Sequence, residues 1–170
     1  DVVDKSKGRE EETMEEKTNV MRILEQKKVP YQAHFYGDTK AISGTEVAAI
    51  LGENPAQVFK TLVTAGKTGQ HYVFVIPVEK ELDLKKAAKA VGEKSIAMIK
   101  AKELLPLTGY IHGGCSPIGM KKFFRTTIDE SVAGWDSFLF SAGKIGYQIE
   151  MSPEDLQKVI TYRTADLTVE

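Results

Sequence analysis

A lysine stands in an otherwise apolar stretch, Lys60 within residues 58–63, and its position could carry chemistry. Strand alternation puts Lys60 on one face and Phe59 and Thr61 on the other. Both faces are largely apolar, which is typical of a central strand covered on both sides. A buried ammonium needs a partner, a polar cleft or a lowered pKa. Two interpretations stay open: a lysine that extends from a strand edge to water, and an amine that holds an anion or a polarised carbonyl.

Two glycine-rich loops could present backbone N–H groups to a bound oxygen. Residues 113–119 contain three glycines and one proline, and N–H groups that converge in such a loop can bind a carbonyl or phosphate oxygen. A purely structural turn is an equal interpretation. Met120 follows where a P-loop requires Lys and then Ser or Thr, so this is not a P-loop. The second loop, residues 141–146, is by itself an ordinary hairpin connection.

The remaining reactive side chains are weaker candidates. Cys115, three residues after His112, could be a nucleophile, but a small buried loop residue is the commoner role of a lone cysteine. His34, His71 and His112 lack the spacing of a zinc site, so we expect no metal and no cofactor. With one cysteine, the chain cannot form an internal disulfide.

Two basic clusters are typical of solvated surfaces but could also hold phosphates, with strong salt sensitivity. They consist of Lys85, Lys86 and Lys89, and of Lys121, Lys122 and Arg125.

Composition places the chain among folded proteins of one domain. It has 170 residues, of which 42% are apolar and 28% charged. Apolar runs are too short for a membrane helix, and the charged amino terminus does not resemble a secretory signal. We therefore expect a cytoplasmic protein that does not enter a membrane.

Residues 1–16 differ from the rest, because they hold seven acids, three bases and almost nothing apolar. Such a segment cannot offset its ordering entropy, so we expect a flexible acidic tail or an appended remnant, with Met14 as a possible natural start. Residues 17–170 form the expected single domain. They carry twenty bases and seventeen acids, a mildly basic balance that permits a polyanionic partner.

The elements that must position these residues alternate between hairpins and isolated helices. This order favours an α+β fold, with a mixed sheet and helices packed outside it. Ser43 with Glu46 forms a capping box, and Ser152-Pro153 is a helix start. The expected helices cover residues 19–27, 44–51, 84–91, 100–105 and 153–160. The expected strands cover residues 32–36, 57–65, 71–78, 108–112, 123–128, 138–141, 147–151 and 162–168.

Three segments together resemble the YbaK/EbsC proteins. Residues 59–62, 113–119 and 141–146 stand in the order and spacing of that family, and the helix start at residues 83–88 is also similar. The resemblance covers residues 17–168. It implies a mostly antiparallel, partly closed barrel-like sheet, related to the editing insertion of bacterial prolyl-tRNA synthetase. It also implies a free-standing editing domain that hydrolyses mischarged Cys-tRNA(Pro) and acts on Cys-tRNA(Cys).

The resemblance also assigns roles to residues. Lys60 is the expected essential, catalytic lysine, which would anchor the terminal nucleotide or stabilise developing charge. The expected substrate-binding residues are Tyr36, Thr61, Gly113, Gly114, Ser116, Ser141 and Gln148. Gln148 departs from the family, which often has aspartate there. The segment between Tyr36 and Gly44 is shorter than in some relatives, and an aromatic residue expected near Ser43 is absent.

The implied mechanism is substrate-assisted, with the substrate thiol attacking its own ester and the N–H groups of Gly113 and Gly114 favouring the oxyanion. The expected partners are tRNA(Pro) and tRNA(Cys), with prolyl-tRNA synthetase as a candidate for delivering them. Three alternatives stay open. They are an Ala-tRNA(Pro) deacylase, an aminoacyl-tRNA-binding protein without turnover, and a lysine Schiff-base enzyme.

Overall fold

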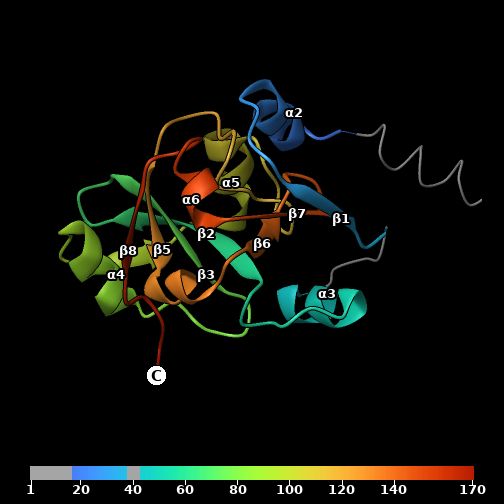
Figure 1. Cartoon of the computed structure of the whole chain (residues 1–170). Helices are drawn as coiled ribbons and strands as arrows, with labels where there is room; N and C mark the ends of the chain where they lie inside the picture. Colours follow the sequence, from blue (N-terminus) through green and yellow to red (C-terminus); the bar gives the residue numbers. More distant parts are fainter. Residues whose placement is uncertain (1–16, 38–42) are drawn as a thin grey trace, which may run out of the picture.

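The computed structural model describes residues 17–37 and 43–170 (Figure 1). The helices are α2 (Asn19–Gln26), α3 (Gly44–Leu51), α4 (Leu84–Val91), α5 (Ala101–Thr108) and α6 (Pro153–Leu156), with the 3₁₀ helix η1 (Glu130–Gly134). The strands are β1 (Gln32–Phe35), β2 (Phe59–Gly66), β3 (His71–Pro77), β4 (Ile96–Met98), β5 (Arg125–Asp129), β6 (Phe138–Ser141), β7 (Tyr147–Met151) and β8 (Tyr162–Ala165).

The strands form two sheets. One has the order β1-β7-β6 and is antiparallel. The other has the order β4-β2-β3-β5-β8, in which β5 runs parallel to both β3 and β8. An isolated parallel bridge between Val58 and Leu139 joins the two sheets at the start of β2. The expected α+β fold with a mixed, mostly antiparallel sheet and outer helices is confirmed.

The largest core lies between the two sheets and includes Phe59, Val63, Phe138 and Phe140. Helix α4 covers the other face of the five-stranded sheet (Figure 1). There Ala87 of the helix and Phe74 of β3 belong to one buried hydrophobic cluster. The strand β2 is therefore covered on both faces, as its sequence predicts.

Helix α3 begins at the junction of the sheets. The Ser43 side chain caps it by accepting a hydrogen bond from the Glu46 N–H at 3.2 Å. Gly44 approaches the end of β3 so closely that a Cβ there would lie 2.4 Å from Cγ1 of Val78. This close approach brings the amino-terminal turn of α3 to the edge of β2.

Three expectations about elements need correction. Residues 108–112 are not a strand: α5 extends to Thr108 and ends at Gly109, whose φ of 84° closes the helix. Tyr110 then donates its hydroxyl to Ile118 O, so the segment forms a loop that is anchored by the buried Tyr110. Helix α6 ends at Leu156, where the backbone changes to tighter turns with bonds from Lys158 N to Asp155 O and from Val159 N to Leu156 O. The short strand β4 was not expected from its sequence.

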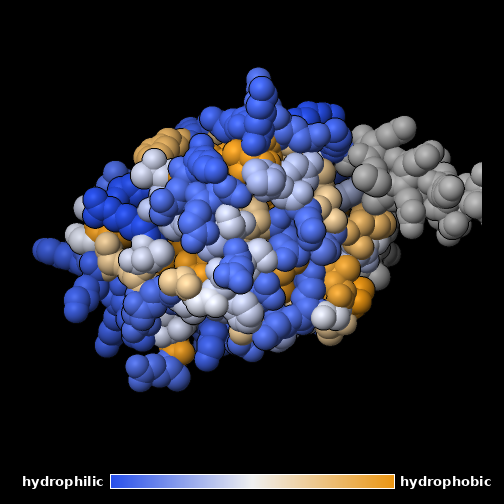
Figure 2. Space-filling model, viewed as in Figure 1, coloured by the Kyte–Doolittle hydropathy of each residue, from blue (hydrophilic) through white to orange (hydrophobic). Residues whose placement is uncertain are grey.

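The face in Figure 2 is mostly polar and is interrupted by small apolar patches. One of them lies at lower right, over α3, where Ile50 is 54% exposed. Within residues 17–37 and 43–170, no helix is long and apolar enough to cross a membrane.

Candidate functional site

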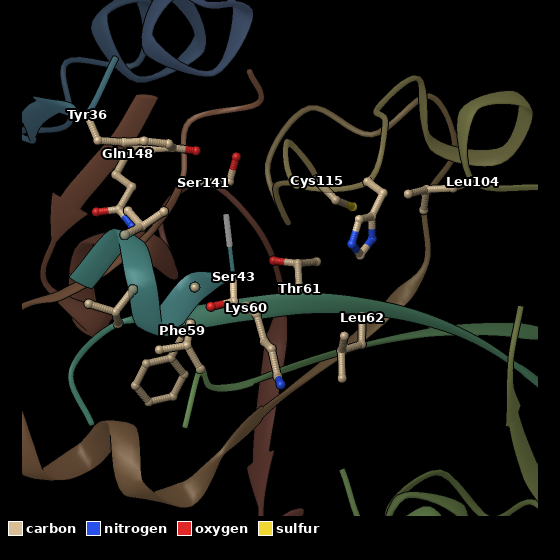
Figure 3. Close-up of a pocket in the computed structure, with 16 residues that line it drawn as sticks. Tyr36, Ser43, Phe59, Lys60, Thr61, Leu62, Leu104, Cys115, Ser141 and Gln148 are labelled. Carbon is tan, nitrogen blue, oxygen red and sulfur yellow. The ribbon is translucent and has the colours of Figure 1, made fainter. Parts of the chain in front are cut away.

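A pocket of about 320 Å³ lies where α3, the first half of β2 and both glycine-rich loops meet (Figure 3). It is lined by Tyr36, Ser43, Gly44, Val47, Val58, Phe59, Lys60, Thr61, Leu62, Val78, Leu104, His112, Gly113, Cys115, Ser141 and Gln148. Six of the eight site residues expected from the sequence are in this lining: Tyr36, Lys60, Thr61, Gly113, Ser141 and Gln148.

One wall of the pocket is an open edge of β2. Val78 N donates to Val58 O, and Gly66 N donates to Gln70 O. In an antiparallel pair this pattern means that the backbone N–H and C=O groups of the even-numbered β2 residues point toward β3, while those of the odd-numbered residues point toward the opposite edge. Strand β4 pairs with the opposite edge at residues 64–66, and Ile99 N, just after β4, donates to Val63 O at 3.4 Å. The alternation therefore turns the N–H and C=O of Thr61 toward the pocket, where a ligand can reach them.

Lys60 is half-buried in this wall. Burial lowers the pKa of its amine, and Glu81 partly opposes the shift. No hydrogen bond or ion pair joins its Nζ to another described residue. Its side chain extends away from Thr61, Cys115 and Ser141, as alternation requires (Figure 3). An amine in a concave wall that has no hydrogen-bond or ion-pair partner among the described residues is suited to holding an anionic group.

Two buried oxygens of the pocket have no hydrogen-bond partner in the described structure, Thr61 Oγ1 and Gln148 Oε1. Gln148 is only 6% exposed. It pairs in register with Ser141, so both side chains project from the same face of the β6–β7 pair. The Ser141 hydroxyl accepts a hydrogen bond from Gly143 N at 3.1 Å. Unsatisfied buried oxygens are costly, and a bound ligand is one way to satisfy them.

The first glycine-rich loop contributes to the pocket at Gly113 but not at Gly114 or Ser116. The Gly114 N–H already donates to Ile111 O at 3.0 Å. A Cβ at Gly114 would lie 3.2 Å from Ile145 N, so this glycine allows the two loops to pack closely. Ser116 is fully buried, and its hydroxyl accepts a hydrogen bond from Ile118 N. Of the two N–H groups expected to bind an oxyanion, that of Gly114 is therefore occupied.

Cys115 and His112 also line the pocket. Cys115 is buried, and burial raises the pKa of its thiol to about 12. At neutral pH it is a thiol, not the thiolate that a nucleophilic cysteine needs. This agrees with the expectation of a small buried loop residue.

Several lining residues were missed by the sequence analysis. Ser43 was recognised only as a helix cap, and Leu104 only as part of a helix. Nothing local in the sequence brings either near Lys60, because the packing of α3 and α5 against β2 does so. His112 could have been named as a pocket residue from the sequence, because it directly precedes the Gly113-Gly114 pair. No group of three or more His, Cys, Asp or Glu among the described residues could hold a metal ion.

The charge of the lining limits what it can bind. Lys60 is its one lysine, and no arginine, aspartate or glutamate stands among the sixteen described lining residues. Backbone N–H groups and buried polar oxygens surround a largely apolar floor. The arrangement suits a small polar group joined to an anionic one, such as an ester attached to a nucleotide.

The chain is similar to known proteins in sequence and in fold. The family of aminoacyl-tRNA editing domains matches residues 39–159. EbsC of Enterococcus faecalis, assigned as a Cys-tRNA(Pro)/Cys-tRNA(Cys) deacylase, is 46% identical over 155 residues, covering 91% of this chain and 94% of that protein.

Two further proteins are similar to the chain at lower identity. A proline–tRNA ligase of Pelobacter propionicus is 29% identical over 107 residues, which are 63% of this chain and 18% of the ligase. A crystal structure assigned as a trans-editing enzyme for prolyl-tRNA synthetase superimposes with a TM-score of 0.78 at 24% identity. It covers 90% of this chain and 99% of that one, and it supports the fold.

Proposed function

The chain belongs to the aminoacyl-tRNA editing domain family, and on that premise we propose that it releases cysteine from Cys-tRNA(Pro) and Cys-tRNA(Cys). The observation that carries the proposal is the 46% identity to a relative so assigned, over nearly the full length of both chains. The reaction breaks the ester between cysteine and the 3′ ribose of tRNA. It would take place in the cytoplasm, where tRNA is charged.

The attacking group is proposed to be the thiol of the substrate. Its sulfur forms a bond to the carbonyl carbon of the same residue, and the ester C–O bond breaks. The thiol proton passes to the ribose oxygen. The resulting thiolactone is opened by water. The buried Cys115 thiol cannot easily supply this nucleophile. Orientation alone can supply much of the rate enhancement for such an intramolecular step.

Lys60 is proposed to anchor the terminal nucleotide. Its amine extends to the side of β2 away from Thr61 and Ser141 (Figure 3). The ester would therefore lie beside Thr61 and Gly113, and a phosphate or ribose oxygen beside Lys60. The developing oxyanion would be stabilised by the N–H groups of Gly113 and Thr61. Tyr36, Ser141 and Gln148 would surround the aminoacyl group.

The proposed function is tested by deacylation of Cys-tRNA(Pro), Cys-tRNA(Cys) and Ala-tRNA(Pro) in one panel. We expect the wild type to prefer the cysteinyl substrates and Lys60→Ala to lose at least about 100-fold in kcat/KM. Lys85→Ala, at an exposed position on α4, is the matched control. Absence of hydrolysis by the wild type would reject the function, and equal rates for Lys60→Ala would reject the role of the lysine.

The substrate-assisted step has its own test. Ser-tRNA(Pro) has nearly the same shape but a hydroxyl, which is a much poorer nucleophile than a thiol. We expect its hydrolysis to be at least about 100-fold slower at similar binding. Equal rates for the two substrates would show that the attacking group is water.

A second candidate function rests on Gln148, which stands where the family often has a carboxylate. A protein that binds aminoacyl-tRNA without turnover would bind a non-hydrolysable amide analogue tightly and hydrolyse none of the esters.

We further propose delivery of tRNA by prolyl-tRNA synthetase, since part of a proline–tRNA ligase resembles this chain. Faster deacylation in the presence of the synthetase would support it.

A further inference from the structure

A second pocket, of about 360 Å³, has no part in the proposed function so far. It lies between the end of the first glycine-rich loop and the segment that follows α6. Its lining residues are Pro117, Gly119, Met120, Lys121, Lys122, Phe123, Phe124, Thr126, Val159, Ile160 and Thr161. Two of the basic residues that the sequence offers as a solvated surface or a phosphate site, Lys121 and Lys122, stand at this pocket.

The charge of the second pocket is positive and uncompensated. Lys121 and Lys122 are exposed, and neither forms an ion pair with a described residue. The described lining contains no aspartate or glutamate. Two free ammonium groups at one concave surface attract a polyanion, and the attraction weakens as salt rises.

An aromatic side chain stands beside these cations. Phe123 is 79% exposed, more than any other large apolar residue described. Its neighbour Phe124 is half-buried and packs edge-to-face on His71, with ring centroids 6.0 Å apart. An exposed ring next to lysines is the arrangement on which unpaired bases stack while their phosphates are neutralised.

The loop that presents these residues is held by the rest of the fold. Tyr110 donates its hydroxyl to Ile118 O, and Lys121 N donates to Thr108 O at 3.0 Å. A Cβ at Gly119 would lie 2.8 Å from the Tyr110 hydroxyl, so the turn fits closely. A surface fixed in this way loses little conformational entropy when a ligand binds.

The two pockets lie on the same loop. Cys115 lines the first and Pro117 lines the second. Their Cα atoms are two residues apart, hence at most about 7 Å. The two pockets therefore share this loop as a wall, and a nucleic-acid strand whose last nucleotide enters the first pocket is the candidate occupant of the second.

We propose that the second pocket binds an unpaired nucleotide of the tRNA 3′ strand, upstream of the nucleotide that carries the amino acid. The base stacks on Phe123, and the phosphates lie beside Lys121 and Lys122. This rests on the proposed function for the identity of the strand. It goes beyond that function by giving the substrate a second contact, which binds nucleotide whatever amino acid is attached.

The binding test uses the wild type and a fluorescent tetranucleotide, ACCA, that reproduces a tRNA 3′ end. We expect Phe123→Ala to weaken binding about tenfold and Phe123→Trp to retain it, because tryptophan also stacks. The double variant Lys121→Ala/Lys122→Ala should reduce the slope of log K against log salt by about 1.4, since each neutralised phosphate of a single strand contributes about 0.7.

Matched controls come from α4, on the other face of the five-stranded sheet. Leu84→Ala removes an exposed apolar side chain, and Lys85→Ala/Lys89→Ala removes the same charge. Neither should change affinity or the salt slope by more than experimental error. An equal effect of the control and test lysines would show that only net charge matters, which would overturn the proposed site.

A second test separates the two pockets by substrate length. Cysteinyl-adenosine ester ends at its first nucleotide, so its hydrolysis reports the first pocket alone. Phe123→Ala should raise KM for Cys-tRNA(Pro) about tenfold with little change in kcat. If the wild type hydrolyses both substrates and the variant matches it on both, the second site is rejected and the function stands. If the wild type hydrolyses neither, the function fails, and oligonucleotide binding alone decides on the second site.

Discussion

Cys115 lies in the wall of the first pocket, yet burial raises the pKa of its thiol to about 12. The fraction of thiolate at neutral pH is therefore very small, and the residue contributes volume to the wall instead of reactivity. We predict that Cys115→Ala keeps kcat/KM for Cys-tRNA(Pro) within about threefold of the wild type, with a stability loss of about 1 kcal/mol from the smaller side chain. Deacylation rates and chemical denaturation measure the two effects. A loss above 100-fold without destabilisation would identify Cys115 as a nucleophile.

Gln148 combines near-complete burial with an amide oxygen that has no partner in the described structure. Such an oxygen costs about 1–3 kcal/mol when it is left unsatisfied. We predict that Gln148→Leu raises stability by about 1 kcal/mol and lowers kcat/KM at least tenfold, because the polar contact with the aminoacyl group is lost. Thermal unfolding and deacylation of Cys-tRNA(Pro) test this pair of effects.

The matched control is Gln57→Leu, because the Gln57 amide donates to Ser137 O at 2.9 Å and is partnered. This variant should lose stability. Should Gln148→Leu instead lose stability and keep its activity, the glutamine would have a structural role.

At this scale the sequence locates some site residues and not others. Lys60 can be found because a charge in an apolar strand is a local anomaly. Thr61 can be found because it stands next to Lys60 in the same strand. Gly114 and Ser116 belong to the same motif as Gly113, but the motif does not tell which of its members face inward. Only the packing of Gly114 against Ile145 in the second loop answers that.

At the scale of elements, α3 forms one side of the pocket, and a close approach of Gly44 helps to set its position. A Cβ at Gly44 would lie 2.8 Å from Cβ of Val78, a branched side chain that cannot move away. We predict that Gly44→Ala displaces α3, costs about 1–3 kcal/mol as overpacking does, and lowers deacylation. The double variant Gly44→Ala/Val78→Ala should recover part of the stability and part of the deacylation rate, because the clash is removed.

A double-mutant cycle provides the control for this prediction. Val78→Ala alone deletes buried methyl groups and should be destabilising. The sum of the two single effects should therefore exceed the effect of the double variant by more than about 0.5 kcal/mol. Additive effects would show that the helix does not depend on this contact.

An electrostatic interaction joins Glu53, just after the end of α3, to two ionisable side chains of the β1–β7 pair. Glu53 follows α3, and both of its carboxylate oxygens are buried without a partner in the described structure. Burial raises the pKa of Glu53 above its ordinary value, His34 lowers it in part, and Glu150 raises it. His34 and Glu150 are themselves paired at 2.9 Å. The folded state therefore holds the Glu53 proton to a higher pH than the unfolded chain does.

The sign of the pH effect follows from this shift. Above an ordinary pKa of 4.5, the unfolded chain releases the proton first, so the contribution of Glu53 to stability falls as pH rises through the folded-state pKa. We predict that Glu53→Gln is more stable than the wild type at pH 7, by about 1 kcal/mol, and that the difference shrinks toward pH 4. Urea denaturation at several pH values measures it. The exposed Glu79→Gln is the control, and a pH-independent difference would contradict the interpretation.

The elements that the sequence predicts well are those whose signals are local. The capping residues Ser43 and Ser152 mark helix starts that the structure has. Residues 108–112 looked like a strand because Thr108, Tyr110 and Ile111 favour strands. Their conformation instead depends on Tyr110 reaching Ile118 O, a contact that local propensity does not contain.

At the scale of the whole molecule, charge is distributed unevenly along the chain. Residues 17–170 hold twenty bases and seventeen acids, while residues 1–16 hold seven acids and three bases. The formal net charge of −1 for the full chain therefore combines a mildly basic domain with an acidic segment. An acidic segment lowers the long-range electrostatic attraction of the chain for a polyanion such as tRNA.

We propose that residues 17–170 are the independent folding unit, since α2 begins with the Thr18 side chain accepting from Met21 N at 3.2 Å. We predict that a chain starting at residue 17 unfolds within about 2 °C of the full chain. It should also bind deacylated tRNA several-fold more tightly at low salt, because seven acids are removed.

The affinity difference should disappear as salt is raised, because screening weakens long-range attraction between exposed charges. Calorimetry and fluorescence anisotropy between low and physiological salt measure the two properties. A full chain in which the seven acids of residues 1–16 are replaced by glutamine is the control, and because it keeps the three bases of that segment, it should bind at least as tightly as the truncated one. If the truncated chain melts well below the full one, residues 1–16 contribute to the fold, and the domain would have to be extended to include them.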